Sequence, residues 1–215
     1  MTRKSVWHDD YWLMLLQAYM QKPIGLKPLY SRTMVNLSME LHMPPQELRK
    51  RMEQIANLTT PRIERIWQTY SKDPKRLERA VRLLREMKGF GAANEFYEGV
   101  EVEETFEKDF RPLAEDPRLT PAMLIIILDL YFQLTPPTMV AQTPEVRELG
   151  RLLKLKADDV ANILDVMQHC DPYLNRQDVI LSPLLLPCQQ VWQRFGNQDQ
   201  SVLAAHANEL KAYFK

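Results

Sequence analysis

The chain has 215 residues, with 28 Lys+Arg against 28 Asp+Glu, and 45% of its residues are hydrophobic. This composition is typical of a soluble globular protein and excludes a strongly basic or strongly acidic chain. Two cysteines are too few for a disulfide framework, and the polar residues 1–10 do not form a secretory signal, so we expect a cytoplasmic protein. The most apolar run, residues 123–134, is interrupted by Asp129 and is too short to span a bilayer, so no membrane contact is expected.

Apolar residues recur mostly at three- and four-residue spacing, and the chain has only six glycines, so the sequence predicts an all-α fold. In the first half, Ser31 is a favourable helix cap, and prolines suit the first turn of a helix. The helices expected there begin at Asp9 or Asp10, after Ser31, at Pro45, at Pro61 and at Pro74. The outward face of the last of these helices, residues 74–88, carries a row of cations: Lys75, Arg76, Arg79, Arg82, Arg85 and Lys88.

Between the halves, residues 89–118 hold 3 Lys+Arg against 9 Asp+Glu. This acidic stretch also holds several aromatic residues, so we expect an ordered connector rather than a free linker. In the second half, the helix over residues 121–134 is apolar nearly all round and should be the most buried element. Further on, Val179, Ile180 and Leu181 predict a short β arm near residues 172–182, or a wing-like hairpin.

The two halves echo each other at a constant offset of 112 residues. Tyr19 pairs with Tyr131, and Leu41 pairs with Leu153. Later the offset grows to 125, where Trp67 matches Trp192, so the second copy carries about 13 extra residues. The matching apolar positions predict an internally duplicated helical bundle, with a helix-turn-helix-like unit in each half. The expected domains are a first repeat over residues 1–88, the connector over 89–118 and a second repeat over 119–215.

Three stretches resemble an uncharacterised family of bacterial proteins of unknown function. They are MKGFG at 87–91, EFYEGVEV at 95–102 and LLLPCQQVW at 184–192. The resemblance covers nearly the whole chain and transfers no functional residues, because the family has no assigned activity. Each half also loosely resembles a winged-helix or helix-turn-helix domain, a fold that serves both DNA binding and protein contact.

No residue set predicts an enzyme or a cofactor site. The glycines at 89 and 91 lack the third glycine and the preceding strand of a phosphate-binding loop. No two of the four histidines have metal-ligand spacing. Cys170 follows His169, but adjacent side chains do not normally face each other, so we interpret it as a core thiol. We therefore expect no catalytic residue, no metal and no cofactor.

Charge distribution gives the main functional hypothesis. Residues 1–88 hold 17 Lys+Arg against 9 Asp+Glu, whereas residues 119–215 hold 8 against 10. In helix-turn-helix proteins the second helix enters the major groove, and flanking cations contact phosphates. The sequence thus predicts binding of double-stranded DNA through the first repeat, by six candidate residues: Arg49, Lys50, Arg51, Arg32, Arg62 and Arg65.

The alternative is a non-catalytic interaction module that binds a protein partner or a second copy of the chain. The acidic connector favours this alternative, as do Asp158, Asp159 and Asp165 on the second repeat, which phosphates would repel. An overall pI near 6.9 is also low for a dedicated nucleic-acid binder. The sequence leaves the partner, the target site and the oligomeric state open.

Overall fold

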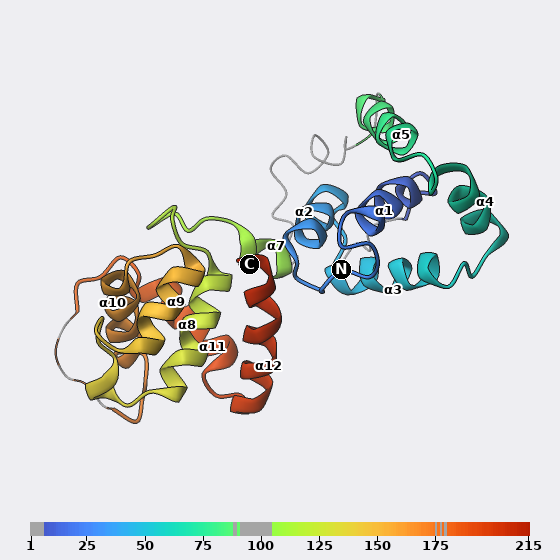
Figure 1. Cartoon of the computed structure of the whole chain (residues 1–215). Coiled ribbons are helices and arrows are strands. Elements are labelled where there is room, and N and C mark those ends of the chain that lie inside the picture. Colours follow the sequence, from blue (N-terminus) through green and yellow to red (C-terminus); the bar gives the residue numbers. More distant parts are fainter. Residues whose placement is uncertain (1–6, 88–89, 91–104, 175, 177, 179) are drawn as a thin grey trace. The chain divides into compact units, whose positions relative to one another are not determined.

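A computed structural model describes residues 7–87, 90, 105–174, 176, 178 and 180–215. The chain divides into two compact units, residues 1–103 (unit 1) and residues 104–215 (unit 2), which are treated separately below. The helices of unit 1 are α1 (Tyr11–Met20), α2 (Arg32–Leu41), α3 (Pro45–Ala56), α4 (Pro61–Tyr70) and α5 (Pro74–Glu86). Those of unit 2 are α7 (Thr105–Phe110), α8 (Pro121–Gln133), α9 (Pro144–Leu153), α10 (Ala157–Gln168), α11 (Leu185–Phe195) and α12 (Gln200–Leu210), with short 3₁₀ helices η1 (Pro136–Thr138) and η2 (Lys211–Tyr213). The all-α prediction is confirmed over the described residues (Figure 1).

Polar caps followed by proline start several of these helices. The side chain of Thr60 accepts a hydrogen bond from the backbone N–H of Ile63, and Asp73 accepts one from Arg76. Thr120 caps α8 in the same way, through the N–H of Met123. In each case a proline follows the cap. The N–H of that position has no partner within a helix, so the absence of this group in proline breaks no hydrogen bond. Local sequence therefore determines where these helices begin.

Helix α1 forms the centre of unit 1 and contacts α2, α3, α4 and α5 (Figure 1). Its buried side chains include Met14, Leu15 and Leu16, each no more than 1% exposed. They pack in one hydrophobic core with buried residues of the other four helices, among them Leu48 of α3 and Val81 of α5. Each of these helices buries one apolar stripe, so the opposite faces are left to polar and charged residues.

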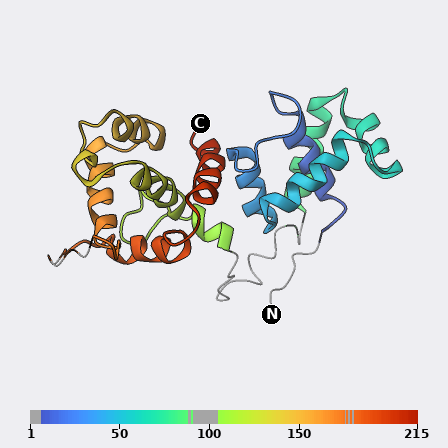
Figure 2. The same ribbon diagram turned by 90° about the horizontal axis from the view of Figure 1, so that it is seen from below.

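Helix α8 has the same central place in unit 2, where it contacts α7, α9, α10, α11 and α12 (Figure 2). Every residue from Ala122 to Tyr131 is buried, including the carboxylate-bearing Asp129. The prediction that this helix is the most buried element is confirmed. Within the described residues, no helix has the length and apolar character needed to cross a bilayer.

A tight left-handed turn joins α2 to α3 and, equivalently, α9 to α10. His42 ends α2 with φ 51° and ψ 40°, and Lys154, 112 residues later, ends α9 with φ 58° and ψ 36°. The residue after each turn donates its N–H to a helix carbonyl five residues earlier. These bonds are Met43 N to Ser38 O at 3.0 Å and Leu155 N to Gly150 O at 2.8 Å. Both are the long hydrogen bond that closes a left-handed helix end.

The predicted β arm near residues 172–182 is wrong for the described residues there, which form no strand. Side-chain bonds hold the segment instead: Asp171 accepts from Tyr131 at 2.7 Å, and Arg176 donates to Asp165 at 2.7 Å. With the segment anchored to α8 and α10, no second strand lies beside it to form a ladder.

The predicted connector, residues 89–118, lies partly outside the described residues. Its described end belongs to unit 2, where α7 contacts α8 and Phe110 is buried. Asp109 pairs with Arg194 of α11 through two bonds of 2.6 and 2.9 Å. Residues 105–118 are therefore an ordered part of the second unit.

Candidate nucleic-acid interface

The three consecutive cations of α3 point in different directions. Because an α-helix turns about 100° per residue, three neighbours span about 200° of its circumference. Arg49 is half-buried; its Nη1 donates to the backbone oxygen of Lys27 at 2.5 Å, and its Nε lies 3.4 Å from Glu53 Oε1. Lys50 is exposed, with Nζ 3.5 Å from Glu47 Oε1. Of the three, only Lys50 faces solvent fully, and a neighbouring carboxylate offsets its charge.

Arg51 is half-buried and packs against the aromatic residue that precedes α1. Its guanidinium carbon lies 4.1 Å from the centroid of the Trp7 ring, which is a cation–π contact. Trp7 in turn meets the ring of Trp12 at a centroid distance of 4.9 Å. Arg51 therefore covers the aromatic edge of the core instead of projecting freely into solvent.

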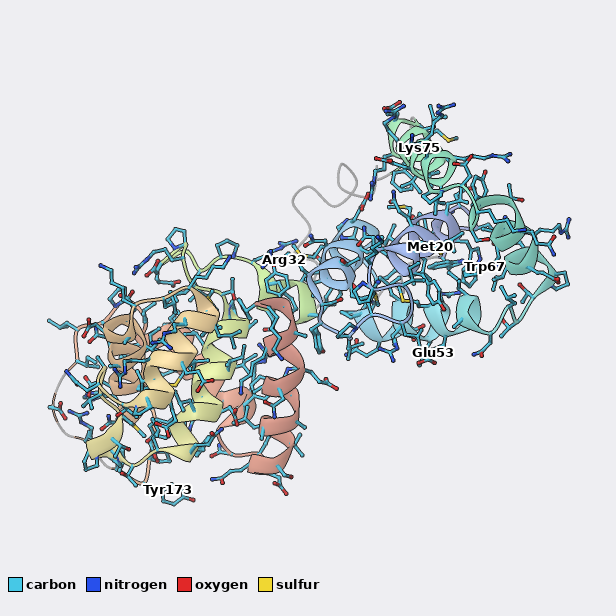
Figure 3. The ribbon with its side chains drawn as sticks, in the orientation of Figure 1. Met20, Arg32, Glu53, Trp67, Lys75 and Tyr173 are labelled. Carbon is cyan, nitrogen blue, oxygen red and sulfur yellow. The ribbon has the colours of Figure 1, made fainter. Side chains whose placement is uncertain are left out.

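The other three predicted cations lie on two helices. Arg62 is exposed on α4, with Nη1 2.6 Å from Asp9 Oδ2. Arg65, also exposed, has its Nε 3.4 Å from the backbone oxygen of Pro61. Arg32 is exposed at the first residue of α2, where it is labelled in Figure 3. The six predicted residues are thus spread over three helices, and ion pairs within 4 Å between described residues involve Arg49, Lys50 and Arg62.

The face of α5 that points away from the core offers a more continuous set of cations. Leu77, Val81 and Leu84 form the buried side of this helix. On the other side, four exposed cations at helical spacing form what we call the α5 basic face: Lys75, Arg76, Arg79 and Arg82. Lys75 is labelled on α5 in Figure 3.

The α5 basic face is only weakly neutralised. Among the described residues, no carboxylate lies within 4 Å of Lys75, Arg76 or Arg79. The Arg82 guanidinium lies 3.9 Å from Glu86, at the limit of an ion pair. Arg85, one of the cations expected on this face, turns away and binds Glu40 of α2 through bonds of 2.6 and 2.9 Å. Lys88 lies outside the described residues.

Helix α10, the counterpart of α3 in unit 2, presents acidic groups. Asp158, Asn162 and Asp165 are exposed at spacings of four and three residues, so they share one face. Asp159 is half-buried and lies 3.4 Å from Arg118. This face repels phosphate, in agreement with the charges along the sequence.

The described residues hold no group of three or more metal-ligating side chains. Burial raises the pKa of Cys170 to about 11 and that of Cys188 to about 12. Both thiols are therefore protonated at neutral pH, whereas a nucleophilic cysteine acts as the thiolate. His169 Nε2 lies 3.5 Å from Asp178 Oδ2.

A polar pocket of about 300 Å³ opens between α1, α2 and α5 of unit 1. The buried side chains of Met14, Ala18 and Leu37 contribute to its lining. Polar groups from the three helices complete the lining: Gln17, Gln21, Arg32, Thr33, Asn36, Glu40 and Arg85. Sequence spacing did not reveal this pocket, because its lining residues come from three helices and are spread between positions 14 and 85 of the chain.

No family model, curated protein or solved structure matches this chain. The function is therefore inferred from the geometry of the two units.

Proposed function

We propose that the chain is a non-catalytic protein in which unit 1 binds double-stranded DNA. The α5 basic face supports this proposal, because it is exposed and continuous, and among the described residues it is nearly free of carboxylate partners. A cation that has no internal partner gives up little when it meets a phosphate, and phosphate contacts supply most of non-specific affinity.

The dimensions of α5 suit a phosphate backbone. Lys75 and Arg82 are seven residues apart, which is about 10 Å along the helix axis. Arg76 and Arg79 lie between them on the same face, so several phosphates of one strand come within reach. In this proposal α3 has a smaller role than the sequence suggested, because Arg49 and Arg51 are held by internal contacts.

Fluorescence anisotropy with a random-sequence duplex tests the proposal. If four cations contact phosphates, the slope of log affinity against log salt is about −3.5, which corresponds to about a 100-fold loss between 50 and 200 mM salt. The double variant Lys75→Glu/Arg79→Glu should weaken binding more than tenfold at low salt. The slope should become shallower by about two, one for each lost phosphate contact.

A matched control is available on unit 2. Arg147 and Arg151 of α9 are exposed at the same four-residue spacing, with no ion-pair partner among the described residues. The variant Arg147→Glu/Arg151→Glu makes the same change in net charge and should leave affinity within about twofold once long-range charge effects are screened. Equal losses in both variants would show that total charge, rather than the α5 basic face, determines binding. Absence of binding at low salt would reject the proposal.

A second candidate function is supported by exposed apolar side chains of unit 2. Tyr173 is 92% exposed and Leu181 is 96% exposed, and Leu186 at the start of α11 is 58% exposed. Apolar side chains that gather into one exposed patch are typical of surfaces that contact another protein, and these three lie between positions 173 and 186 of the chain. This favours an interaction module, with a second copy of the chain as the simplest partner.

Sedimentation analysis over a range of concentrations tests that candidate. A dimer that dissociates on dilution and is lost in Tyr173→Ser/Leu181→Ser supports it. A monomer at all concentrations excludes self-association through this segment. The change Val202→Ser on α12, which is 55% exposed, provides a control for loss of an exposed apolar group elsewhere in unit 2.

We also infer that the two units derive from an internal duplication. In support, the α2–α3 and α9–α10 turns have the same backbone conformation and the same closing hydrogen bond at an offset of 112 residues. The central helix of each unit likewise contacts all four helices that follow it: α1 contacts α2 to α5, and α8 contacts α9 to α12. On this proposal the units diverged in surface charge while they kept their buried faces.

A further inference from the structure

The polar pocket of unit 1 combines amide groups with fixed positive charge. The side-chain amides of Gln17 and Asn36 have no hydrogen-bond partner among the described residues, and both residues line the pocket. Thr33 Oγ1 donates to Gln21 Oε1 at 3.0 Å, which leaves the amide N–H groups of Gln21 for another acceptor. Free amides offer donors and acceptors side by side, which is the pattern that pairs with the edge of a nucleobase.

Arg85 is held in one orientation on the wall of this pocket. Its Nε and Nη2 donate to the two carboxylate oxygens of Glu40, at 2.6 and 2.9 Å. A guanidinium has five N–H groups, so this bidentate pair leaves the Nη1 group unused. Hydrogen bonding to Glu40 also raises the pKa of Arg85, so the guanidinium stays charged. A fixed cation with free N–H groups is suited to bind a phosphate or a carboxylate.

A further feature favours an anion in the same place. Arg32 and Thr33, both on the pocket wall, are the first two residues of α2, whose amino-terminal end carries partial positive charge. The charged side chains that line the pocket are Arg32, Arg85 and Glu40. Its volume of about 300 Å³ is at the lower end of the range for small-molecule sites.

The corresponding positions of unit 2 are chemically different. At the offset of 112, Asp129 takes the place of Gln17. Near the end of the chain the second copy has one more extra residue, which makes the offset 126, and there Lys211 takes the place of Arg85. Asp129 is buried, and its Oδ2 lies 3.5 Å from Lys211 Nζ. The cation at this position of unit 2 is thus neutralised by a buried carboxylate. At these two positions, the amide and the guanidinium occur in unit 1 and not in unit 2.

We propose that this pocket binds a nucleoside 5′-monophosphate. The phosphate contacts Arg85 Nη1 and Arg32 at the start of α2. The base lies over Met14 and Leu37, and its edge pairs with the amides of Gln17 and Asn36. A nucleoside 5′-monophosphate occurs both as a free nucleotide and as the terminal residue of a nucleic-acid strand. This proposal does not depend on DNA binding by the α5 basic face.

Proton–nitrogen NMR spectra of the full chain, titrated with AMP, GMP, CMP and UMP up to about 5 mM, test the proposal. The expected result is a saturable shift of resonances in α1, α2 and the end of α5. Asn36→Leu and Gln17→Leu should each weaken binding about tenfold, because each removes hydrogen bonds to the base. Gln54→Leu, which removes an exposed amide on α3, should have no effect.

The other arms separate the possible ligands. A saturable shift with a single-stranded hexanucleotide, but not with mononucleotides, would support the same chemistry and assign it to a strand end. Inorganic phosphate that shifts the same resonances equally well, with no effect of Asn36→Leu, would overturn the proposal. So would an absence of saturable shifts with any probe. The variant Lys75→Glu/Arg79→Glu should weaken duplex binding more than tenfold without changing mononucleotide binding, so the two proposals fail independently.

Discussion

The ion pair between Asp109 and Arg194 should contribute measurably to the stability of unit 2. Its side chains are 9% and 35% exposed, and two bonds of 2.6 and 2.9 Å join them. Removal of one partner from a fully buried pair costs about 3–5 kcal/mol, because a charge is left without compensation. Since Arg194 is about one-third exposed, solvent screens part of this loss. We expect Arg194→Met to lower the free energy of unfolding by about 2 kcal/mol.

A double-mutant cycle measured by urea denaturation isolates this interaction. Asp109→Leu, Arg194→Met and the double variant should give a coupling energy of at least about 2 kcal/mol, with the double variant close to the wild type. The double variant replaces two charges by apolar groups, so no unpaired charge remains. If the two single effects add to within about 0.5 kcal/mol, the pair is not coupled, and the reasoning is refuted.

His206 reports on the same pair by NMR titration. Burial lowers the pKa of His206; the charge of Asp109 raises it, and that of Arg194 lowers it. Asp109→Asn should therefore lower the pKa of His206 further, whereas Arg194→Met should raise it. Opposite signs are the critical result, because a general loosening of unit 2 would expose His206 and raise its pKa in both variants.

Three other predictions concern the cores and the tight turns. The pKa values of Cys170 and Cys188, about 11 and 12 against 9.0 for an ordinary thiol, mean that unfolding releases protons above pH 9. Stability should fall by about 1 kcal/mol per thiol at pH 10, and denaturation of the Cys→Ala variants at pH 8 and 10 should show a smaller fall. A Cβ on Gly150 would lie 3.0 Å from the backbone oxygen of Leu155, so Gly150→Val should cost about 2 kcal/mol in urea denaturation. Ser38 Oγ is buried without a partner among the described residues, so Ser38→Ala should be neutral or stabilise by up to about 1 kcal/mol in the same assay; a clear loss would indicate an undetected bond.

Local signals in the sequence predicted the helices well because their causes are local. Thr120 followed by Pro121 defines the start of α8, and the apolar run that follows can only form a buried helix in a chain of this kind. The β arm was predicted from Val179, Ile180 and Leu181 alone. A strand also needs a neighbour to pair with, and a short apolar run carries no information about that neighbour.

The candidate site was harder to predict, because the direction of a long side chain depends on tertiary partners. One part of the geometry follows from the sequence alone: Arg49, Lys50 and Arg51 are consecutive, so in a helix they cannot share one face. The contacts that hold Arg49 to Lys27 and Arg51 to Trp7 were not predictable, since they join residues more than 20 positions apart.

The number of cations in unit 1 is therefore a poor guide to its binding surface. Arg49 and Arg51 both add to the positive balance, yet Arg49 is committed to a backbone carbonyl and Arg51 to an aromatic ring within the unit. Moving one of them to a phosphate means breaking an internal contact, and this cost reduces the gain in binding. Lys75 and Arg79 carry no such cost. A charge reversal on α5 should accordingly weaken DNA binding with little loss of stability. A charge reversal at Arg51 should lower stability with little effect on DNA binding.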